Sequence, residues 1–415
     1  MKNGVVIVGA GHAGVQAAAS LREDGYDGPV ILISDENELP YHKPPLSKTF
    51  IKDAEAKPQP LRGEAFYTGS AIDYRPGIRI DRIDAGRLDI AGGGALAFDH
   101  LILATGSRPR TLPLPGSDLS GVLSLRSLAD ARRIRDLSAQ SEDVVILGGG
   151  FIGLEIAATL RAAGRTVTVV EAVDRLLGRA VAPVVASHVR QRLEATGVRI
   201  LTGTSISKLE GENGHVVAAI TSSGERLPAR MVIVGIGAVP NVELAQGAGL
   251  TIANGIRVDH QMRSSVPEIL AIGDAASYRH WFTGGDVRLE SVQNATDQAR
   301  LAARTITGHA DAYSAVPWFW SDIGDMKLQM VGLTAGGDSH VVLGDLPDNK
   351  FSIYHYAGDR LLGIESVNRP GDHMLGRKML GAGFSPTPET VAIGPEGLKA
   401  ALAEFQTMEP AKVRA

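Results

Sequence analysis

Two glycine-rich turns carry the clearest chemistry in this chain of 415 residues. The first reads Gly9-Ala10-Gly11-His12-Ala13-Gly14, and the second reads Gly148-Gly149-Gly150-Phe151-Ile152-Gly153. Such a turn lets backbone N–H groups approach a pyrophosphate, and the start of the following helix offsets the phosphate charge. A carboxylate follows each turn at about the 20 residues where a ribose hydroxyl needs an acceptor, Asp35 in the first copy and Glu171 in the second. The two copies predict two nucleotide cofactors in one polypeptide, a flavin and a nicotinamide.

The second carboxylate bears on which nicotinamide is used. A negative charge at Glu171 repels a 2′-phosphate, so NADH is favoured over NADPH. Arg175 and Arg179 follow closely in the sequence and weaken this preference.

The elements around both turns repeat in the same order. A buried strand precedes each turn (5–8 and 144–147), a helix follows it (13–22 and 154–163), and a second strand precedes the carboxylate (30–33 and 166–170). Two further strands, 101–104 and 231–234, end in Thr105-Gly106 and in Gly235. The repetition predicts a duplicated βαβ domain of Rossmann type.

The chain after residue 317 lacks the glycine pattern and is expected to form a separate α+β domain, with strands near 341, 351–356 and 361–367. The predicted fold is therefore α/β, with two dinucleotide-binding domains and a C-terminal α+β domain. We expect the first dinucleotide-binding domain to be discontinuous (1–112 and 242–316), the second to span 113–241, and the C-terminal domain to span 317–415.

Several further residues have both a chemical and a purely structural interpretation. Asp274 follows the strand 269–272 and precedes an expected helical stretch, where it can cap that helix or accept hydrogen bonds from a bound polyol. Glu155 can be a helix-dipole carboxylate in the helix after the second turn. Lys48, which follows two prolines, would ordinarily be a solvated lysine.

The aromatic and basic clusters are also ambiguous. Trp318 and Trp320 can pack in a core or shield one face of a flavin. Arg300 and Arg304, one helical turn apart, can form a basic patch with Arg288 and Lys327 or simply lie on a solvated face.

The composition excludes several classes of protein. The chain has no cysteine, which removes disulfide relays, cysteine nucleophiles and cysteine-ligated metals, and no metal site is expected. Its net charge of −4 gives no field for nucleic acid or a membrane surface. We expect a cytoplasmic protein, because the start of the chain does not read as a leader and no apolar run reaches the roughly 20 residues needed to span a bilayer.

The most specific segments are Pro44-Pro45-Leu46-Ser47-Lys48, Glu290-Ser291-Val292-Gln293-Asn294-Ala295 and Pro317-Trp318-Phe319-Trp320-Ser321-Asp322. Together with the two glycine turns, the chain resembles the FAD-dependent NADH:ferredoxin reductases of bacterial oxygenase systems. The resemblance covers nearly the whole chain and implies a fold of the glutathione-reductase type. The sequence departs from the pattern of this family at two places, His42-Lys43 before the prolines and Ile323 after the tryptophans.

The resemblance implies a role for individual residues. Lys48, Glu155 and Trp320 should lie at the reactive centre, where Lys48 and Glu155 pair as orienting groups and Trp320 lies beside the flavin. The FAD site should comprise Gly9, Gly11, His12, Ala13, Gly14, Asp35, Lys48, Ile80, Ala104, Thr105, Gly106, Arg126, Asp274, Val292 and Trp320. The NADH site should comprise Gly148, Gly150, Phe151, Ile152, Gly153, Glu155, Glu171, Arg179 and Gly235.

The activity implied is electron transfer from NADH through FAD to a 2Fe–2S ferredoxin, which feeds a haem monooxygenase or a ring-hydroxylating dioxygenase. The ferredoxin would dock transiently near Arg300, Arg304 and Trp320. Rubredoxin remains an alternative acceptor. A flavin-bearing redox sensor or interaction protein with low turnover remains an alternative of another class.

Overall fold

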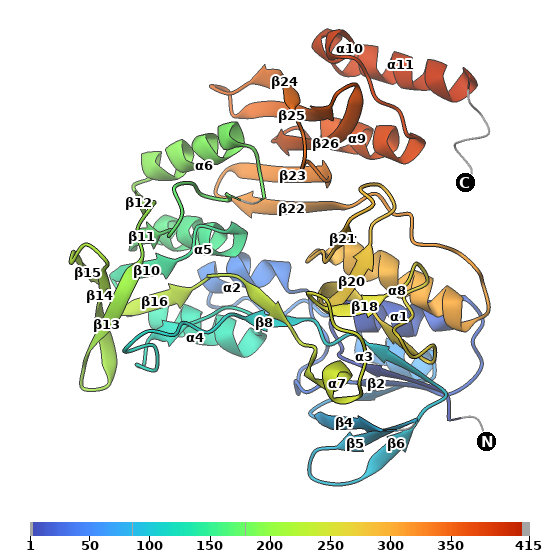
Figure 1. The fold of residues 1–415 in the computed structure, drawn as a ribbon. Coiled ribbons are helices and arrows are strands. Elements are labelled where there is room, and N and C mark those ends of the chain that lie inside the picture. Colours follow the sequence, from blue (N-terminus) through green and yellow to red (C-terminus); the bar gives the residue numbers. More distant parts are fainter. Residues whose placement is uncertain (1–2, 85, 179, 409–415) are drawn as a thin grey trace. The chain divides into compact units, whose positions relative to one another are not determined.

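The computed structural model describes residues 3–84, 86–178 and 180–408 (Figure 1). The chain forms two compact units, and each is built from several separate segments. The first unit contains 1–42, 58–108 and 238–315, and the second contains 43–57, 109–237 and 316–415. Segment 43–57, which carries the Pro-Pro-Leu-Ser-Lys motif, thus clusters with the second unit.

The first unit is built on a five-stranded parallel sheet. Helices cover the faces of a parallel sheet, so its strands are buried and consist of apolar residues. The short runs of valine, isoleucine and leucine in the sequence predict such strands. The strand order is β19 (Ile269–Ala271), β7 (His100–Leu103), β1 (Val5–Val8), β2 (Val30–Ile33) and β3 (Ile72–Arg75).

The helices of this unit include α1 (His12–Glu23) and α8 (Val292–Ile306), which pack against each other. The remaining elements are short: α3 (Glu64–Gly69), β4 (Ile80–Asp84), β5 (Arg87–Ile90), β6 (Ala95–Ala97), β8 (Ser107–Pro109), β17 (Ala238–Pro240), α7 (Glu243–Gly247), β18 (Ile256–Val258), η2 (Gly273–Ala275), β20 (Ala276–Arg279) and β21 (Asp286–Val287).

The second unit repeats the parallel sheet. Its order is β12 (Arg199–Leu201), β11 (Thr166–Val170), β10 (Asp143–Leu147), β16 (Met231–Val234) and β9 (Val122–Leu123). The other elements before the C-terminal part are η1 (Pro44–Ser47), α2 (Thr49–Lys52), α4 (Leu128–Ser138), α5 (Phe151–Ala162), α6 (Pro183–Ala195), β13 (Ile206–Glu212), β14 (His215–Thr221) and β15 (Arg226–Pro228).

The C-terminal part of the second unit is an antiparallel sheet with helices. The order is β22 (Trp318–Ile323), β23 (Met326–Gly332), β26 (Arg360–Val367), β25 (Lys350–Ala357) and β24 (Ser339–Asp345). Helices α9 (Pro370–Ala382), α10 (Pro388–Ile393) and α11 (Pro395–Met408) follow (orange to red in Figure 1). One apolar cluster joins this sheet to α6 and the parallel sheet, for example through Val185, Ile353 and Phe351.

The fold class predicted from the sequence is confirmed. Among the described residues, no helix is long and apolar enough to cross a membrane. One local prediction was wrong: the segment after Asp274 is not helical, because a single 3-10 turn leads directly into strand β20, which is buried at Ala276–Tyr278. The helix after the second turn begins at Phe151, three residues earlier than expected, because Gly150 serves as its N-cap.

Candidate functional site

The first glycine turn joins β1 to α1 and lies very close to the end of the neighbouring strand β7. Gly9 has φ +106°, and a Cβ there would lie 2.2 Å from the carbonyl oxygen of Ala104. A Cβ on Gly14 would lie 1.8 Å from the carbonyl oxygen of Gly9. Both positions therefore require glycine, whereas a Cβ on Gly11 meets nothing within 4 Å. The turn is closed on its protein side and open where a ligand would approach.

The second glycine turn has the same construction. Gly148 has φ +105°, and a Cβ there would lie 2.3 Å from the carbonyl oxygen of Gly235. A Cβ on Gly153 would lie 2.4 Å from the carbonyl oxygen of Gly148, and Gly150 again has nothing within 4 Å. The two turns are thus equivalent in geometry as well as in sequence.

These turns fit a dinucleotide. Gly11 and Gly150 are the N-caps of helices α1 and α5, and neither supplies a side-chain acceptor to the first N–H groups. N–H groups at a helix start favour anions, and a diphosphate would supply acceptors that these two N-cap residues do not.

The carboxylate after the second turn is held by the turn itself. Glu171 Oε2 accepts the Gly149 N–H at 2.6 Å, and Oε1 accepts the Val173 N–H at 3.0 Å. Arg175 donates to the Gly178 carbonyl oxygen at 2.5 Å. Arg179 lies outside the described residues. Two backbone N–H groups of the chain therefore orient the carboxylate of Glu171.

The carboxylate after the first turn is arranged differently. Asp35 is exposed at the end of β2, while the adjacent Glu36 accepts a hydrogen bond from Tyr41 Oη at 2.6 Å. Asp35 is thus the more exposed of these two neighbouring carboxylates.

Three other predicted FAD residues of the first unit meet at the ends of β7 and β19. Thr105 Oγ1 donates to the Asn241 carbonyl oxygen at 2.7 Å, and the Asn241 N–H donates to the Gly106 carbonyl oxygen at 2.9 Å. Asp274 Oδ2 accepts from Ser107 Oγ at 2.9 Å. Since no helix follows Asp274, its interpretation as a helix cap is wrong, and its carboxylate is oriented by a serine instead.

The remaining predicted FAD residues have varied settings. His12 and Ala13 begin α1, Ile80 is buried at 6% exposure on β4, and Val292 begins α8 after its N-cap Ser291. Lys48, Arg126 and Trp320 belong to the second unit. The Arg126 carbonyl oxygen accepts from Lys43 Nζ at 3.4 Å.

The second unit contains a buried carboxylate that binds donors from separate segments. Glu155 is 4% exposed on α5, and its Oε2 lies 2.8 Å from Lys48 Nζ. The same oxygen accepts from Ser47 Oγ at 2.5 Å, and Oε1 accepts from Ser321 Oγ at 2.6 Å. An unpaired carboxylate this deeply buried would be costly, and three donors from two distant segments remove that cost. The helix-dipole interpretation of Glu155 therefore does not describe its setting.

The sequence analysis missed the two serines in this group. Ser47 and Ser321 are each 1% exposed, and both lie inside the motifs that were recognised, next to Lys48 and Trp320. The burial of a polar residue within a specific motif is the signal that could have identified them. Without the fold, nothing indicated that the two motifs converge on one carboxylate.

The tryptophans lie on β22 beside this group. Trp320 is half-buried, its ring centroid is 5.7 Å from that of Trp318, and Arg377 lies 4.5 Å above the Trp318 ring. Phe151, the first residue of α5, packs edge-on against Phe319 at 5.0 Å. By contrast, Ile152 is 48% exposed and leaves an apolar side chain at the helix start.

The expected basic patch is largely neutralised. Arg300 pairs with Asp297 at 2.9 Å, and Arg304 pairs with Asp311. Arg288 is only 10% exposed and pairs with Glu290 at 2.6 Å. These arginines form separate ion pairs rather than an uncompensated patch.

Comparison with known proteins shows the family to which the chain belongs. Residues 3–299 match the family model described as pyridine nucleotide-disulphide oxidoreductase, and residues 318–402 match the reductase C-terminal model. The chain is 44% identical to rhodocoxin reductase of Rhodococcus erythropolis over 97% of this chain and 95% of that protein. It is also 44% identical to a rubredoxin–NAD(+) reductase of Pseudomonas putida, over 88% of this chain and 96% of that protein.

Two solved structures of reductases resemble the chain over nearly its whole length. The ferredoxin reductase for the CYP199A2 system of Rhodopseudomonas palustris matches with a TM-score of 0.94 and 45% identity, covering 97% of this chain and 100% of that one. Putidaredoxin reductase in its covalent complex with putidaredoxin matches with a TM-score of 0.93 and 37% identity, covering 96% and 99%. The chain therefore belongs to the pyridine nucleotide-disulphide oxidoreductase family, in the form that carries a reductase C-terminal domain.

Proposed function

We propose that this chain is the reductase of an oxygenase electron-transfer system, an enzyme that passes electrons from NADH through FAD to a 2Fe–2S ferredoxin. The observation that carries the proposal is the group around Glu155. It joins the Pro-Pro-Leu-Ser-Lys turn, the helix of the second glycine turn and the strand of Trp320 through three hydrogen-bonding contacts.

FAD and NAD(H) are the cofactors. FAD accepts two electrons together from NADH and releases them singly, which is the chemistry that a one-electron ferredoxin requires. The residues of the first glycine turn with Asp35, Ile80, Thr105, Asp274 and Val292 would hold FAD. The residues of the second turn with Glu155, Glu171, Arg179 and Gly235 would hold NADH. The N–H groups at the starts of α1 and α5 would bind the two diphosphates.

The chain's own contribution at the centre is orientation and charge. The Lys48 ammonium and the Glu155 carboxylate hold each other in one arrangement, and the two serines restrict the carboxylate from both sides. Such restraint keeps a bound ring in a reactive geometry. No proton carrier is needed at this pair.

NADH is the proposed donor in preference to NADPH. The orientation of Glu171 by Gly149 and Val173 supports this choice, because a fixed carboxylate accepts from a ribose diol and repels a 2′-phosphate.

A ferredoxin is the proposed electron acceptor, and Trp320 the residue beside which electrons leave. Similarity to a reductase captured with its redox partner supports this assignment. We propose that Trp320 of the second unit takes part in docking, and that Arg300 and Arg304 of the first unit exchange Asp297 and Asp311 for acidic groups of the ferredoxin. The ferredoxin would then supply a haem monooxygenase or a ring-hydroxylating dioxygenase. We expect this in the cytoplasm, where NADH is available.

Rubredoxin is the second candidate acceptor, favoured by the 44% identity to a rubredoxin reductase. Because that similarity covers 88% of the chain, whereas the ferredoxin reductase for the CYP199A2 system matches 97% of it at 45% identity, we place ferredoxin first.

Stopped-flow mixing tests the proposal. The FAD-loaded protein is mixed anaerobically with NADH, and then with a 2Fe–2S ferredoxin or a rubredoxin. We expect complete bleaching of the flavin absorbance and fast reduction of the ferredoxin. Slow, partial bleaching with no reduction of either acceptor would instead support a low-turnover sensor.

A further inference from the structure

A second buried carboxylate in this chain has no part in the proposed chemistry. Glu365 lies on β26, is 2% exposed, and both its oxygens approach the backbone N–H of Ala182, at 3.0 and 2.9 Å. His355 Nε2 lies 3.5 Å from Oε2. A carboxylate buried in an apolar sheet is costly, so its retention calls for a reason.

The residue that it binds begins a helix. Ala182 is the N-cap of α6, and its methyl side chain cannot accept a hydrogen bond from the helix start. Glu365 therefore places a negative charge at the positive end of α6 from a strand that is 183 positions away in sequence. The C-terminal sheet thereby fixes the point at which the loop before α6 ends.

The described residues of that loop are 171–178 and 180–182, and they include Glu171 and Arg175. Its first half is attached to the second glycine turn: Glu171 accepts from Gly149, and the Leu177 N–H donates to the Gly149 carbonyl oxygen at 2.9 Å. Leu177 also has φ +52°, an unfavourable conformation for leucine that needs support from its surroundings. The loop is thus held by the glycine turn at one end and by Glu365 at the other.

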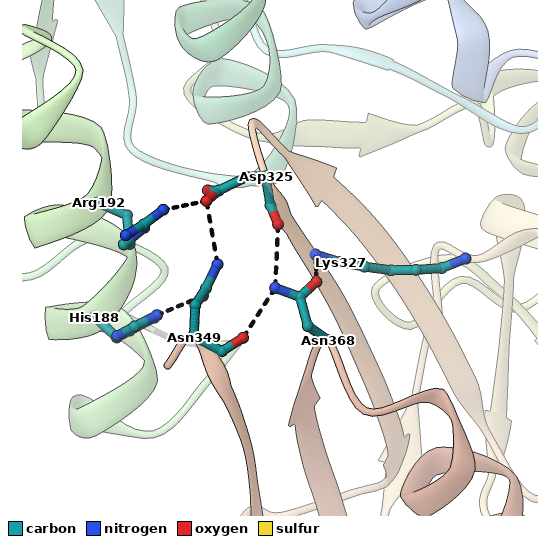
Figure 2. Close-up of polar contacts among 6 residues, drawn as sticks. All are labelled: His188, Arg192, Asp325, Lys327, Asn349 and Asn368. Carbon is teal, nitrogen blue, oxygen red and sulfur yellow. Dashed lines mark hydrogen bonds and ion pairs between the residues drawn. The ribbon is translucent and has the colours of Figure 1, made fainter. Parts of the chain in front are cut away.

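Helix α6 is attached to the same sheet further along, as Figure 2 shows. His188 Nε2 and Asn349 Oδ1 lie 2.7 Å apart, and Asp325 accepts from Arg192 and, at 3.3 Å, from Asn349. These contacts hold the body of α6 but do not touch the loop. They supply a matched control, because they anchor the same helix to the same sheet.

We propose that Glu365 is a positioning residue for NADH. By fixing Ala182, it keeps the described loop residues 171–178 and 180–182 in the conformation in which Glu171 meets the nicotinamide nucleotide's ribose. This inference rests on the proposed assignment of Glu171 to NADH. Without Glu365, binding of the nucleotide itself must order the loop. The affinity for the nucleotide therefore falls, while kcat at saturating NADH does not change.

The test compares variants of the FAD-loaded enzyme. Glu365→Leu fills the space but cannot accept a hydrogen bond, Glu365→Gln keeps an acceptor oxygen, and Asp325→Asn disturbs only the contacts of Figure 2. NAD+ binding is titrated by calorimetry, the KM for NADH and kcat are measured, and hydrogen exchange is followed in 172–182.

We expect Glu365→Leu to raise the Kd for NAD+ and the KM for NADH by roughly tenfold, the usual effect of losing a hydrogen bond to a charged group, with kcat within about twofold. Exchange should accelerate in 172–182. Glu365→Gln and Asp325→Asn should stay close to the parent protein, and the visible flavin spectrum should not change in any of them.

A second variant removes the donor of the same hydrogen bond instead of its acceptor, in case Glu365→Leu does not fold. Ala182→Pro removes the donor N–H, and Ala182 already has φ −62°, which suits proline. It should weaken NAD+ binding as Glu365→Leu does.

Wild-type NAD+ affinity in Glu365→Leu, or in a folded Ala182→Pro, overturns the inference. So does an equal loss in Asp325→Asn, because it would indicate only general docking of α6. Glu171→Ala is measured in parallel: if it leaves NAD+ affinity unchanged, the assignment of Glu171 fails, whatever the result at Glu365.

Discussion

Ser321 donates a hydrogen bond to Glu155 across 166 positions of the chain, with 2.6 Å between Oγ and Oε1. Ser321 directly follows Trp320 on β22, and Glu155 lies one turn into α5 after the second glycine turn. The strand at the proposed electron exit is therefore bonded to the helix at the proposed nicotinamide site. We therefore expect a change in this hydrogen bond to affect both places.

The Ser321→Ala variant tests this connection. Loss of the donor leaves Glu155 Oε1 buried without this hydrogen bond, which should cost about 1–3 kcal/mol of unfolding free energy. Flavin reduction by NADH should slow several-fold, and Ser321→Thr should restore it. Ser366→Ala is the control, since Ser366 is equally buried in the same sheet but bonds to Ser352. Equal slowing in both variants would remove Ser321 from the site.

The Lys48→Met variant tests the ion pair. Met keeps the length of the side chain but leaves the Glu155 carboxylate without a counter-charge, so the limiting rate of flavin reduction should fall by about tenfold or more. Stopped-flow absorbance measures this rate at saturating NADH. Lys52→Met, an exposed lysine at the end of α2, should have no effect. An unchanged limiting rate in Lys48→Met would mean that the pair is only structural.

The Glu171→Ala variant tests the donor preference. Removal of the ribose acceptor and of its contacts with Gly149 and Val173 should raise the KM for NADH by about tenfold. The KM for NADPH should rise less or fall, because the repulsion of a 2′-phosphate is also removed. Steady-state assays with both nucleotides give the ratio. An unchanged KM for NADH refutes the role given to Glu171.

The Trp320→Leu variant tests the exit route. Reduction of the flavin by NADH should stay within a few-fold of the parent protein, while reduction of the ferredoxin should fall by about tenfold. Ferricyanide, a small acceptor that needs no docking surface, should still be reduced. Trp281→Leu is the control, because Trp281 is a tryptophan that is 45% exposed, belongs to the first unit and has no proposed role in electron transfer. If the variant lost reduction of the ferredoxin and of ferricyanide together, this result would contradict an exit role for Trp320.

Two buried histidines predict acid sensitivity. Burial lowers the pKa of His280 to about 4, and burial together with the nearby Arg377 lowers the pKa of His373 to about 4. In the unfolded chain both have a pKa of about 6.5, so the unfolded state binds more protons between pH 6.5 and 4. The stability that they contribute is complete above pH 6.5 and is lost as the pH falls towards 4.

Urea midpoints at pH 7.5, 5.5 and 4.5 measure this loss. A His280→Gln variant should show a shallower decrease than the parent protein, since one of the two proton-binding groups is gone. Parallel curves for the two proteins would show that His280 does not contribute.

Local backbone geometry explains which parts of the fold could be read from the sequence. The glycine turns could be predicted from the sequence, because Gly9 and Gly148 combine positive φ with a close approach to a carbonyl oxygen, which no other residue permits. The buried strands were legible as short apolar runs, and strand 30–33 was predicted with its observed bounds. Asp274 was misjudged because strand propensity after it competes with a cap signal that is common in loops.

The sequence alone determined the class of this protein: two turns that must be glycine, carboxylates spaced for two riboses, and motifs specific enough to indicate a family. The tertiary structure decided which side chains meet. Ser47 and Ser321 converge on Glu155, and Glu365 reaches Ala182, over separations of 108 to 183 positions. Turns follow from the conformational limits of neighbouring residues, whereas these contacts arise only when a sheet and helices pack, so no local pattern in the chain encodes them.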